Sequence, residues 1–206
     1  MAERQRVGVL VSGRGSNLQA LIDAVGAADF PARIVGVISN KRGAYALERA
    51  RAADIPSATI SHRQFEGRAA FEEALIAQLR DWQVDWVVLA GFMRVLTPTF
   101  IRAFAPRILN IHPSLLPAFP GVGVQQAALD YGVRVSGCTV HLVDEGTDTG
   151  PIIAQAAVPV RDDDNAESLA ARILVEEHRI FPAAIRQIIS KPWRLVGRRI
   201  VFEDAP

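Results

Sequence analysis

The residues best suited to chemistry are Asn110 and His112, which stand two positions apart at the end of an apolar run. If this run is a strand, the two side chains share one face of it. A carboxamide can donate a hydrogen bond to a developing oxyanion, and an imidazole moves protons near neutral pH. The pair therefore suits acyl transfer to an amine, although an Asn-x-His pair on a strand is more often structural. Pro113 and Pro117 are expected to end the strand and stiffen the following loop.

A second polar cluster favours the catalytic interpretation. Val140 to Val143 alternates like a strand and leads into an acidic loop, Asp144 to Pro151. A carboxylate of this loop could orient the His112 imidazole and favour its protonated form. The two clusters together would supply the acid–base pair that acyl transfer needs.

Four strings of residues resemble the glycinamide ribonucleotide formyltransferase family, the folate-dependent enzymes of purine biosynthesis. The strings are Ser12 to Ala20, Leu89 to Leu96, Asn110 to Pro117 and Gly137 to Asp148. The resemblance runs in order from about residue 6 to about residue 190. The Asn-x-His-x-x-Leu-Leu-Pro string marks the wider formyltransferase superfamily, whereas Gly-Ser-Asn-Leu-Gln-Ala, beginning at Gly15, is more specific to this branch.

This resemblance implies roles for the site residues. It makes Asn110, His112 and Asp148 catalytic, with Asn110 and His112 stabilising the oxyanion and His112 relaying a proton. It implies a ribonucleotide site formed by Gly15, Ser16, Asn17 and Glu177. The residues implied to contact 10-formyltetrahydrofolate are Arg68, Met93, Arg94, Val95, Leu96, Asn110, Asp144, Glu145, Gly146, Thr147 and Asp148. No metal is expected.

The residues alone leave some of these roles open. The glycine-rich turn before Ser16 suits a phosphate, because free amides at a helix N-terminus point toward an anion. Ser16 or Asn17 could instead cap that helix. Met93 and Leu96 could be core residues, and Arg68 could be a solvated arginine at a helix start.

The remaining histidines are expected to be structural: His62 in a solvent-facing loop, His141 half-buried in a strand and His178 on the last helix. Two positions depart from the family. Gln125 stands where relatives usually carry a histidine, and it cannot carry a proton. Leu174 replaces a polar residue that relatives tend to place near the phosphate. We expect both changes to affect affinity rather than the type of reaction.

Composition limits the class of protein. The chain has 206 residues, 50% of them hydrophobic, which suits a single domain, 1–206. Within it we expect residues 1–105 to bind the ribonucleotide phosphate and 106–190 to be catalytic and folate-binding; the tail 191–206 has no predicted role.

The 23 basic and 22 acidic residues nearly cancel, so neither nucleic acid nor membrane is an expected partner. Cys138 is the only cysteine, which agrees with a reducing compartment, and we expect a cytoplasmic protein. We expect a monomer or a homodimer.

Short apolar runs predict parallel strands at 7–11, 34–38, 84–89 and 108–111, joined by helices near 16–26, 44–53, 68–80 and 98–104. This alternation predicts a doubly wound, mainly parallel α/β sheet of the Rossmann-like type, with helices on both faces and a mixed C-terminal strand region. Further on we expect a helix at 123–131, strands at 134–143 and 152–160, and a helix at 166–189 introduced by a cap region at 162–165. A hairpin is expected over 194–202. Ligands of such sheets bind at the carboxyl ends of strands, where the glycine turn and the Asn110 motif both fall.

Other functions remain open at this point. Formyltetrahydrofolate hydrolase, methionyl-tRNA formyltransferase and sugar N-formyltransferases share the Asn-x-His and Asp elements. The hydrolase normally adds an N-terminal regulatory domain and the tRNA enzyme a basic C-terminal domain, and we expect neither here. A non-catalytic folate- or nucleotide-binding module would keep Gly15 to Asn17 but would tolerate loss of His112 or Asp148. Both residues are present, which favours an enzyme.

Overall fold

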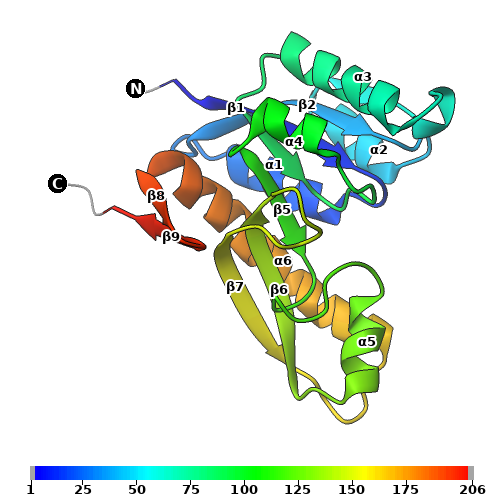
Figure 1. Ribbon diagram of the computed structural model, residues 1–206, viewed down its shortest axis with the longest axis vertical. Coiled ribbons are helices and arrows are strands. Elements are labelled where there is room, and N and C mark those ends of the chain that lie inside the picture. Colours follow the sequence, from blue (N-terminus) through cyan, green and yellow to red (C-terminus); the bar gives the residue numbers. More distant parts are fainter. Residues whose placement is uncertain (1–2, 204–206) are drawn as a thin grey trace. The chain divides into compact units, whose positions relative to one another are not determined.

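The computed structural model describes residues 3–203 (Figure 1). Its elements, in chain order, are β1 (Gln5–Val11), α1 (Ser16–Val25), β2 (Ala32–Ser39), α2 (Tyr45–Ala52), β3 (Ser57–Thr59), the 3-10 helix η1 (His62–Gln64), α3 (Arg68–Asp81), β4 (Trp86–Leu89), α4 (Pro98–Phe104), β5 (Ile108–His112), α5 (Val124–Tyr131), β6 (Val135–Leu142), β7 (Ile152–Pro159), α6 (Ala166–Ser190), β8 (Trp193–Val196) and β9 (Arg199–Phe202).

The main sheet has seven strands in the order β3-β2-β1-β4-β5-β6-β7, and β8 and β9 form a separate antiparallel hairpin. The first five strands of that order pair in parallel, and β6 and β7 pair antiparallel. Helices lie between successive parallel strands, and α1 packs on α2 while α3 packs on α4. The prediction of a doubly wound, mainly parallel sheet with a mixed C-terminal region is confirmed.

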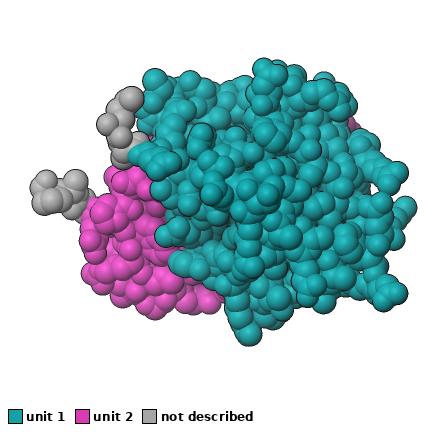
Figure 2. Space-filling view, turned by 90° about the horizontal axis from the view of Figure 1, so that it is seen from above, with its two compact units in different colours: residues 1–110 teal, residues 111–206 magenta. Residues whose placement is uncertain are grey.

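The chain divides into two compact units, residues 1–110 and 111–206, which are coloured separately in Figure 2. In the first unit, β1 is fully apolar at its centre, and Val9, Leu10 and Val11 are completely buried. Strands of a parallel sheet are covered on both faces, which is why their sequences are continuous apolar runs rather than alternating ones.

The second unit is built on β6, β7 and the long helix α6, which packs on both strands. Cys138 on β6 is completely buried, as predicted for a small core residue. Burial, followed by the negative charges of Glu177 and Glu176, raises the pKa of its thiol to about 12.

Helix α6 starts at the predicted cap region. The Asn165 side chain accepts a hydrogen bond from the Ser168 amide, and the Ser168 hydroxyl accepts one from the Asn165 amide, which is a reciprocal capping box. Arg172, one turn further on, forms two hydrogen bonds to the Asp164 carboxylate, at 2.7 and 2.8 Å. The start of the helix is therefore fixed by side chains on both sides of residue 165.

Two short elements were not predicted. Strand β3 contributes only Ser57, Ala58 and Thr59 to the edge of the sheet, and η1 has three residues. Neither is long enough to show an apolar period. His62 belongs to η1 and is half-buried, with its ring edge-on to Phe71 at 6.1 Å, so the expectation of a solvent-facing loop was wrong.

Among residues 3–203, no helix combines the length and the apolar character that a membrane span would need.

Candidate active site

Strand β5 places the two predicted catalytic residues two positions apart, as expected. Ile108, Leu109 and Ile111 are buried, Asn110 is half-buried, and His112 is only 4% exposed. The strand stops at His112 because proline follows. Residues two apart on a strand point to the same face, so Asn110 and His112 present a carboxamide and an imidazole to one side.

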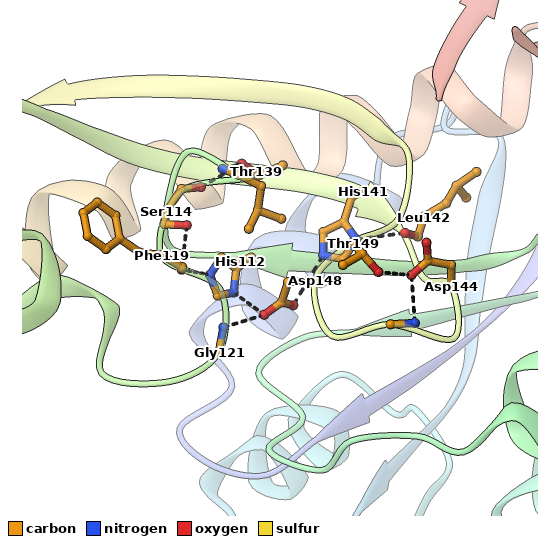
Figure 3. A network of polar contacts seen from close by, with 12 residues as sticks. His112, Ser114, Phe119, Gly121, Thr139, His141, Leu142, Asp144, Asp148 and Thr149 are labelled. Carbon is orange, nitrogen blue, oxygen red and sulfur yellow. Dashed lines mark hydrogen bonds and ion pairs between the residues drawn. The ribbon is translucent and has the colours of Figure 1, made fainter. Parts of the chain in front are cut away.

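The two ring nitrogens of His112 face different partners (Figure 3). Nε2 lies 2.9 Å from the carbonyl oxygen of Phe119, and because a carbonyl can only accept, Nε2 must carry a proton. Nδ1 lies 3.4 Å from Oδ2 of Asp148, so a true ion pair forms when Nδ1 is protonated as well. The geometry therefore suits an imidazolium that is oriented by one carboxylate.

Asp148 is held in place by a second hydrogen bond and by its backbone. Its Oδ2 accepts a hydrogen bond of 2.8 Å from the amide of Gly121, and its side chain is 13% exposed. The residue has φ +54°, in the left-handed region that non-glycine residues seldom occupy. The predicted pairing of the acidic loop with His112 is present in the structure.

A second histidine, expected from the sequence to be half-buried and structural, lies on the other side of this carboxylate. His141 is only 2% exposed, and its Nε2 lies 3.7 Å from Oδ1 of Asp148. Its Nδ1 lies 2.8 Å from the carbonyl of Leu142. Burial lowers the pKa of His141, with smaller opposing effects from the Leu142 carbonyl and Asp148. One signal in the sequence was its position three residues before the acidic loop.

The segment 113–121, here called the proline loop, is fixed by hydroxyl groups. The Ser114 hydroxyl donates to the Ala118 carbonyl at 2.6 Å, and the Thr139 hydroxyl donates to the Ser114 carbonyl at 2.7 Å. The Leu116 amide donates to the same Thr139 oxygen at 3.0 Å. These bonds set where the proline loop presents the Phe119 carbonyl to His112.

The acidic loop is closed by its own first residue. Asp144 Oδ1 accepts hydrogen bonds from the Gly146 amide and the Thr149 hydroxyl, at 3.1 and 2.5 Å. At Gly150 the chain approaches β6 so closely that a Cβ atom would lie 1.7 Å from the Leu142 carbonyl oxygen, so only glycine fits. The hydrogen bonds of Asp144 and the close approach at Gly150 therefore fix the two ends of the loop that carries Asp148.

In the first unit, residues 12–15 form the predicted glycine turn between β1 and α1. Gly15 is the N-cap of α1, with φ +71°, and no side chain caps the helix. Ser16 and Asn17 are the first helical residues, so the alternative in which one of them caps α1 is not realised. A Cβ atom on Gly15 would lie 2.7 Å from the Cα of Ala46, which gives this glycine a structural reason as well.

The predicted folate residues of the first unit are partly exposed. Met93 and Val95 are 59% and 57% exposed, whereas Leu96 is buried, so Leu96 is a core residue and Met93 is not. Arg94 is half-buried, and Arg68 is exposed at the first position of α3. Met93 and Val95 therefore present apolar side chains at the surface.

The remaining predicted positions lie on the helices and on the acidic loop of the second unit. Glu177 is buried on α6, with 7% exposure, and Leu174 and His178 are half-buried on the same helix. Gln125 is half-buried in the first turn of α5. Glu145, Gly146 and Thr147 are exposed on the acidic loop.

Comparisons with known proteins give a consistent result. The model of the family described as formyl transferase matches residues 5–185. The chain is 44% identical to a phosphoribosylglycinamide formyltransferase of Haemophilus influenzae, over 88% of this chain and 86% of that protein. It is 51% identical to the trifunctional purine biosynthetic protein adenosine-3 of Drosophila pseudoobscura pseudoobscura, over 98% of this chain but 15% of that protein. It therefore spans about one seventh of that relative's length.

A solved structure shows the same fold. Glycinamide ribonucleotide transformylase 1 from Symbiobacterium toebii is 48% identical and superposes with a TM-score of 0.96, over 99% of this chain and 96% of that chain.

Proposed function

Since this chain belongs to the formyl transferase family, we propose that it transfers the formyl group of 10-formyltetrahydrofolate to the amine of glycinamide ribonucleotide in purine biosynthesis. The observation that carries this proposal is the buried pair of His112 and Asp148, in which His112 stands two positions after Asn110 on β5 and Asp148 comes from the acidic loop. The acceptor and the donor come from the sequence resemblance and from the relatives described above.

The proposed reaction forms a bond between the acceptor amine and the formyl carbon and breaks the bond from that carbon to the folate nitrogen. Asn110 donates a side-chain N–H to the formyl oxygen as negative charge develops there. His112 in its protonated form stabilises the same charge. Both groups act mainly on the transition state, which is what raises turnover rather than simple affinity.

Proton balance gives His112 its second task. The amine loses one proton when the new bond forms, and the departing folate nitrogen gains one. The imidazole relays this proton, through water, and the Asp148 carboxylate stabilises the imidazolium form during the relay. The acid–base pair therefore returns to its starting state after each turnover.

We propose that the amine attacks directly, without a covalent enzyme intermediate. Two potential nucleophiles of the chain, Cys138 and Ser114, are not activated. The Cys138 thiol is completely buried and has a raised pKa, so it carries almost no thiolate. The Ser114 hydroxyl donates to backbone carbonyls of the proline loop.

For ligand contacts we keep the assignments from the resemblance as proposals. Gly15, Ser16, Asn17 and Glu177 hold the ribonucleotide. The pterin and the glutamate tail are held by Arg68, Met93 to Leu96, Asn110 and Asp144 to Asp148. We further propose that the chain acts in the cytoplasm on these small molecules. The division of tasks at about residue 105 also remains a proposal.

An acceptor comparison tests the function. Purified protein is given 10-formyltetrahydrofolate with glycinamide ribonucleotide, with an amino sugar or with water alone, and formation of tetrahydrofolate is followed. We expect rapid transfer only to the ribonucleotide. Release of formate in water at an equal rate would instead identify a hydrolase, and preference for the amino sugar would identify a sugar N-formyltransferase.

A further inference from the structure

Ser12 is a buried hydroxyl that joins two segments to which the proposed function gives different ligands. It lies directly after β1, at the first position of the glycine turn, and is 3% exposed. Its hydroxyl donates to Oδ1 of Asn40 at 2.7 Å and accepts from the amide of Met93 at 2.8 Å. A hydroxyl can do both at once, so the three residues form one chain of hydrogen bonds with a single direction.

The order of the strands explains why Ser12, Asn40 and Met93 lie together. β1 lies between β2 and β4, and all three run parallel, so their carboxyl ends come together. Ser12 follows β1, Asn40 follows β2, and Met93 lies four residues after β4. Asn40 is itself 2% exposed. In the low-dielectric interior such a chain of hydrogen bonds is strengthened by its neighbours, and an unpaired member would be costly.

The backbone of Ser12 makes the same connection. Its amide donates to the carbonyl of Gly91 at 3.1 Å. Ser12 therefore makes two hydrogen bonds to the 91–96 segment, at Gly91 and at Met93. The far end of this segment is fixed separately, because the Thr97 amide donates to buried Glu72 at 2.9 Å. On the other side, the carbonyl of Gly13 accepts from the Ala46 amide at 3.1 Å. A displacement of the glycine turn therefore moves Ser12, and with it the start of the 91–96 segment.

We infer that the Asn40–Ser12–Met93 hydrogen-bond chain couples the ribonucleotide site to the folate site, so that each ligand strengthens the binding of the other. This inference rests on the proposed function, which gives the ribonucleotide to the residues after the glycine turn and the pterin to the 91–96 segment. A ligand that orders either segment also orders the shared hydroxyl, and the second ligand then meets a segment already in place. Ser12 and Asn40 are positioning residues and need not touch either ligand.

Calorimetric titration measures this coupling. Glycinamide ribonucleotide is titrated into the protein with and without saturating tetrahydrofolate, which lacks the formyl group and allows no transfer. The reverse titration must give the same factor, because coupling is reciprocal. We expect a factor of about fivefold or more in the wild type, in the ordinary range for coupled sites. In Ser12→Ala it should fall below about twofold.

Ser39→Ala is the matched control. Ser39 is completely buried at the end of β2, and within residues 3–203 its hydroxyl bonds to the backbone of Lys41 alone, at 2.9 and 3.1 Å. The variant loses the same atom from an equally buried position without touching the 91–96 segment, and it should keep the wild-type factor. If Ser12→Ala does not fold, Ser12→Cys provides the comparison, because it keeps the shape with a weaker hydrogen-bonding group.

An unchanged factor in the Ser12 variant, or wild-type protein that binds both ligands independently, would overturn the inference and leave the proposed function standing. Wild-type protein that binds neither ligand would overturn both. A loss of coupling in Ser39→Ala equal to that in Ser12→Ala would also overturn the inference, because it would trace the effect to general loosening of the sheet edge.

Discussion

At the scale of single residues, the site is defined by what each imidazole nitrogen faces. In His112 and in His141, one nitrogen points at a backbone carbonyl and the other at Asp148. The carbonyls fix the orientation of both rings, so the carboxylate lies between two nitrogens that can carry a proton only by forming imidazolium. The proposed chemistry depends on this arrangement as well as on the identity of each residue.

Asn110→Ala and His112→Ala should each lower kcat by about a hundredfold or more, the usual cost of one oxyanion donor or one acid–base group. Calorimetry should show nearly unchanged ribonucleotide affinity, because both groups act on the transition state. His178→Ala, which removes the same ring from α6, is the control and should turn over normally. Wild-type kcat in either β5 variant would remove that residue from the mechanism.

Asp148→Asn tests the charge separately from the shape. The variant keeps an oxygen that can accept from the Gly121 amide but loses the charge that attracts the His112 imidazolium. We expect kcat to fall by about a hundredfold, while the thermal unfolding temperature changes little. Steady-state kinetics and calorimetric unfolding check both statements. Full activity in this variant would show that the carboxylate serves only to hold the proline loop.

At the scale of elements, the start of α6 is a cluster of charged and polar groups outside the candidate site. The Asp164 carboxylate accepts from Arg172, from the Arg161 amide and from the Ser168 hydroxyl. Its side chain is only 2% exposed, and the hydrogen bonds from Arg172, followed by that from the Arg161 amide, hold the pKa of Asp164 well below its ordinary value. A carboxyl with a lowered pKa stabilises the fold above the ordinary carboxyl pKa of about 3.9, and the contribution disappears as the pH falls through the lowered pKa.

Asp164→Asn should therefore lower the thermal unfolding temperature by a few degrees at pH 7, with a difference from wild type that shrinks below about pH 4. Asp162→Asn is the control, because Asp162 pairs with Arg134 on the surface, where both side chains are more than 70% exposed. Such pairs contribute little. Scanning calorimetry between pH 3 and 7 makes the comparison. A difference that stays constant with pH would mean that the charge of Asp164 is irrelevant.

At the scale of the whole molecule, the sequence was sufficient for the alternation of strands and helices, because buried parallel strands leave long apolar runs such as that of β1. It was not sufficient for β3, which is too short for any period to appear. His141 was missed as a neighbour of Asp148, because that contact depends on the left-handed backbone at residue 148 and on the close approach at Gly150. The sequence indicated Ser12 only as part of the glycine-turn motif, because its partners Asn40 and Met93 follow two other strands.

Because Cys138 is the only cysteine, the rate at which its thiol is labelled measures the unfolding of the intact protein. Cys138 is completely buried at the centre of β6, and the raised pKa of its thiol leaves almost no reactive thiolate at pH 8. An alkylating reagent should therefore label the folded chain only through opening of the second unit, whereas the unfolded thiol, with a pKa near 8.5, reacts at once. Labelling followed by mass spectrometry across urea concentrations should give the same unfolding free energy as circular dichroism. Faster labelling without urea would reveal local opening of β6 that ordinary spectroscopy does not detect.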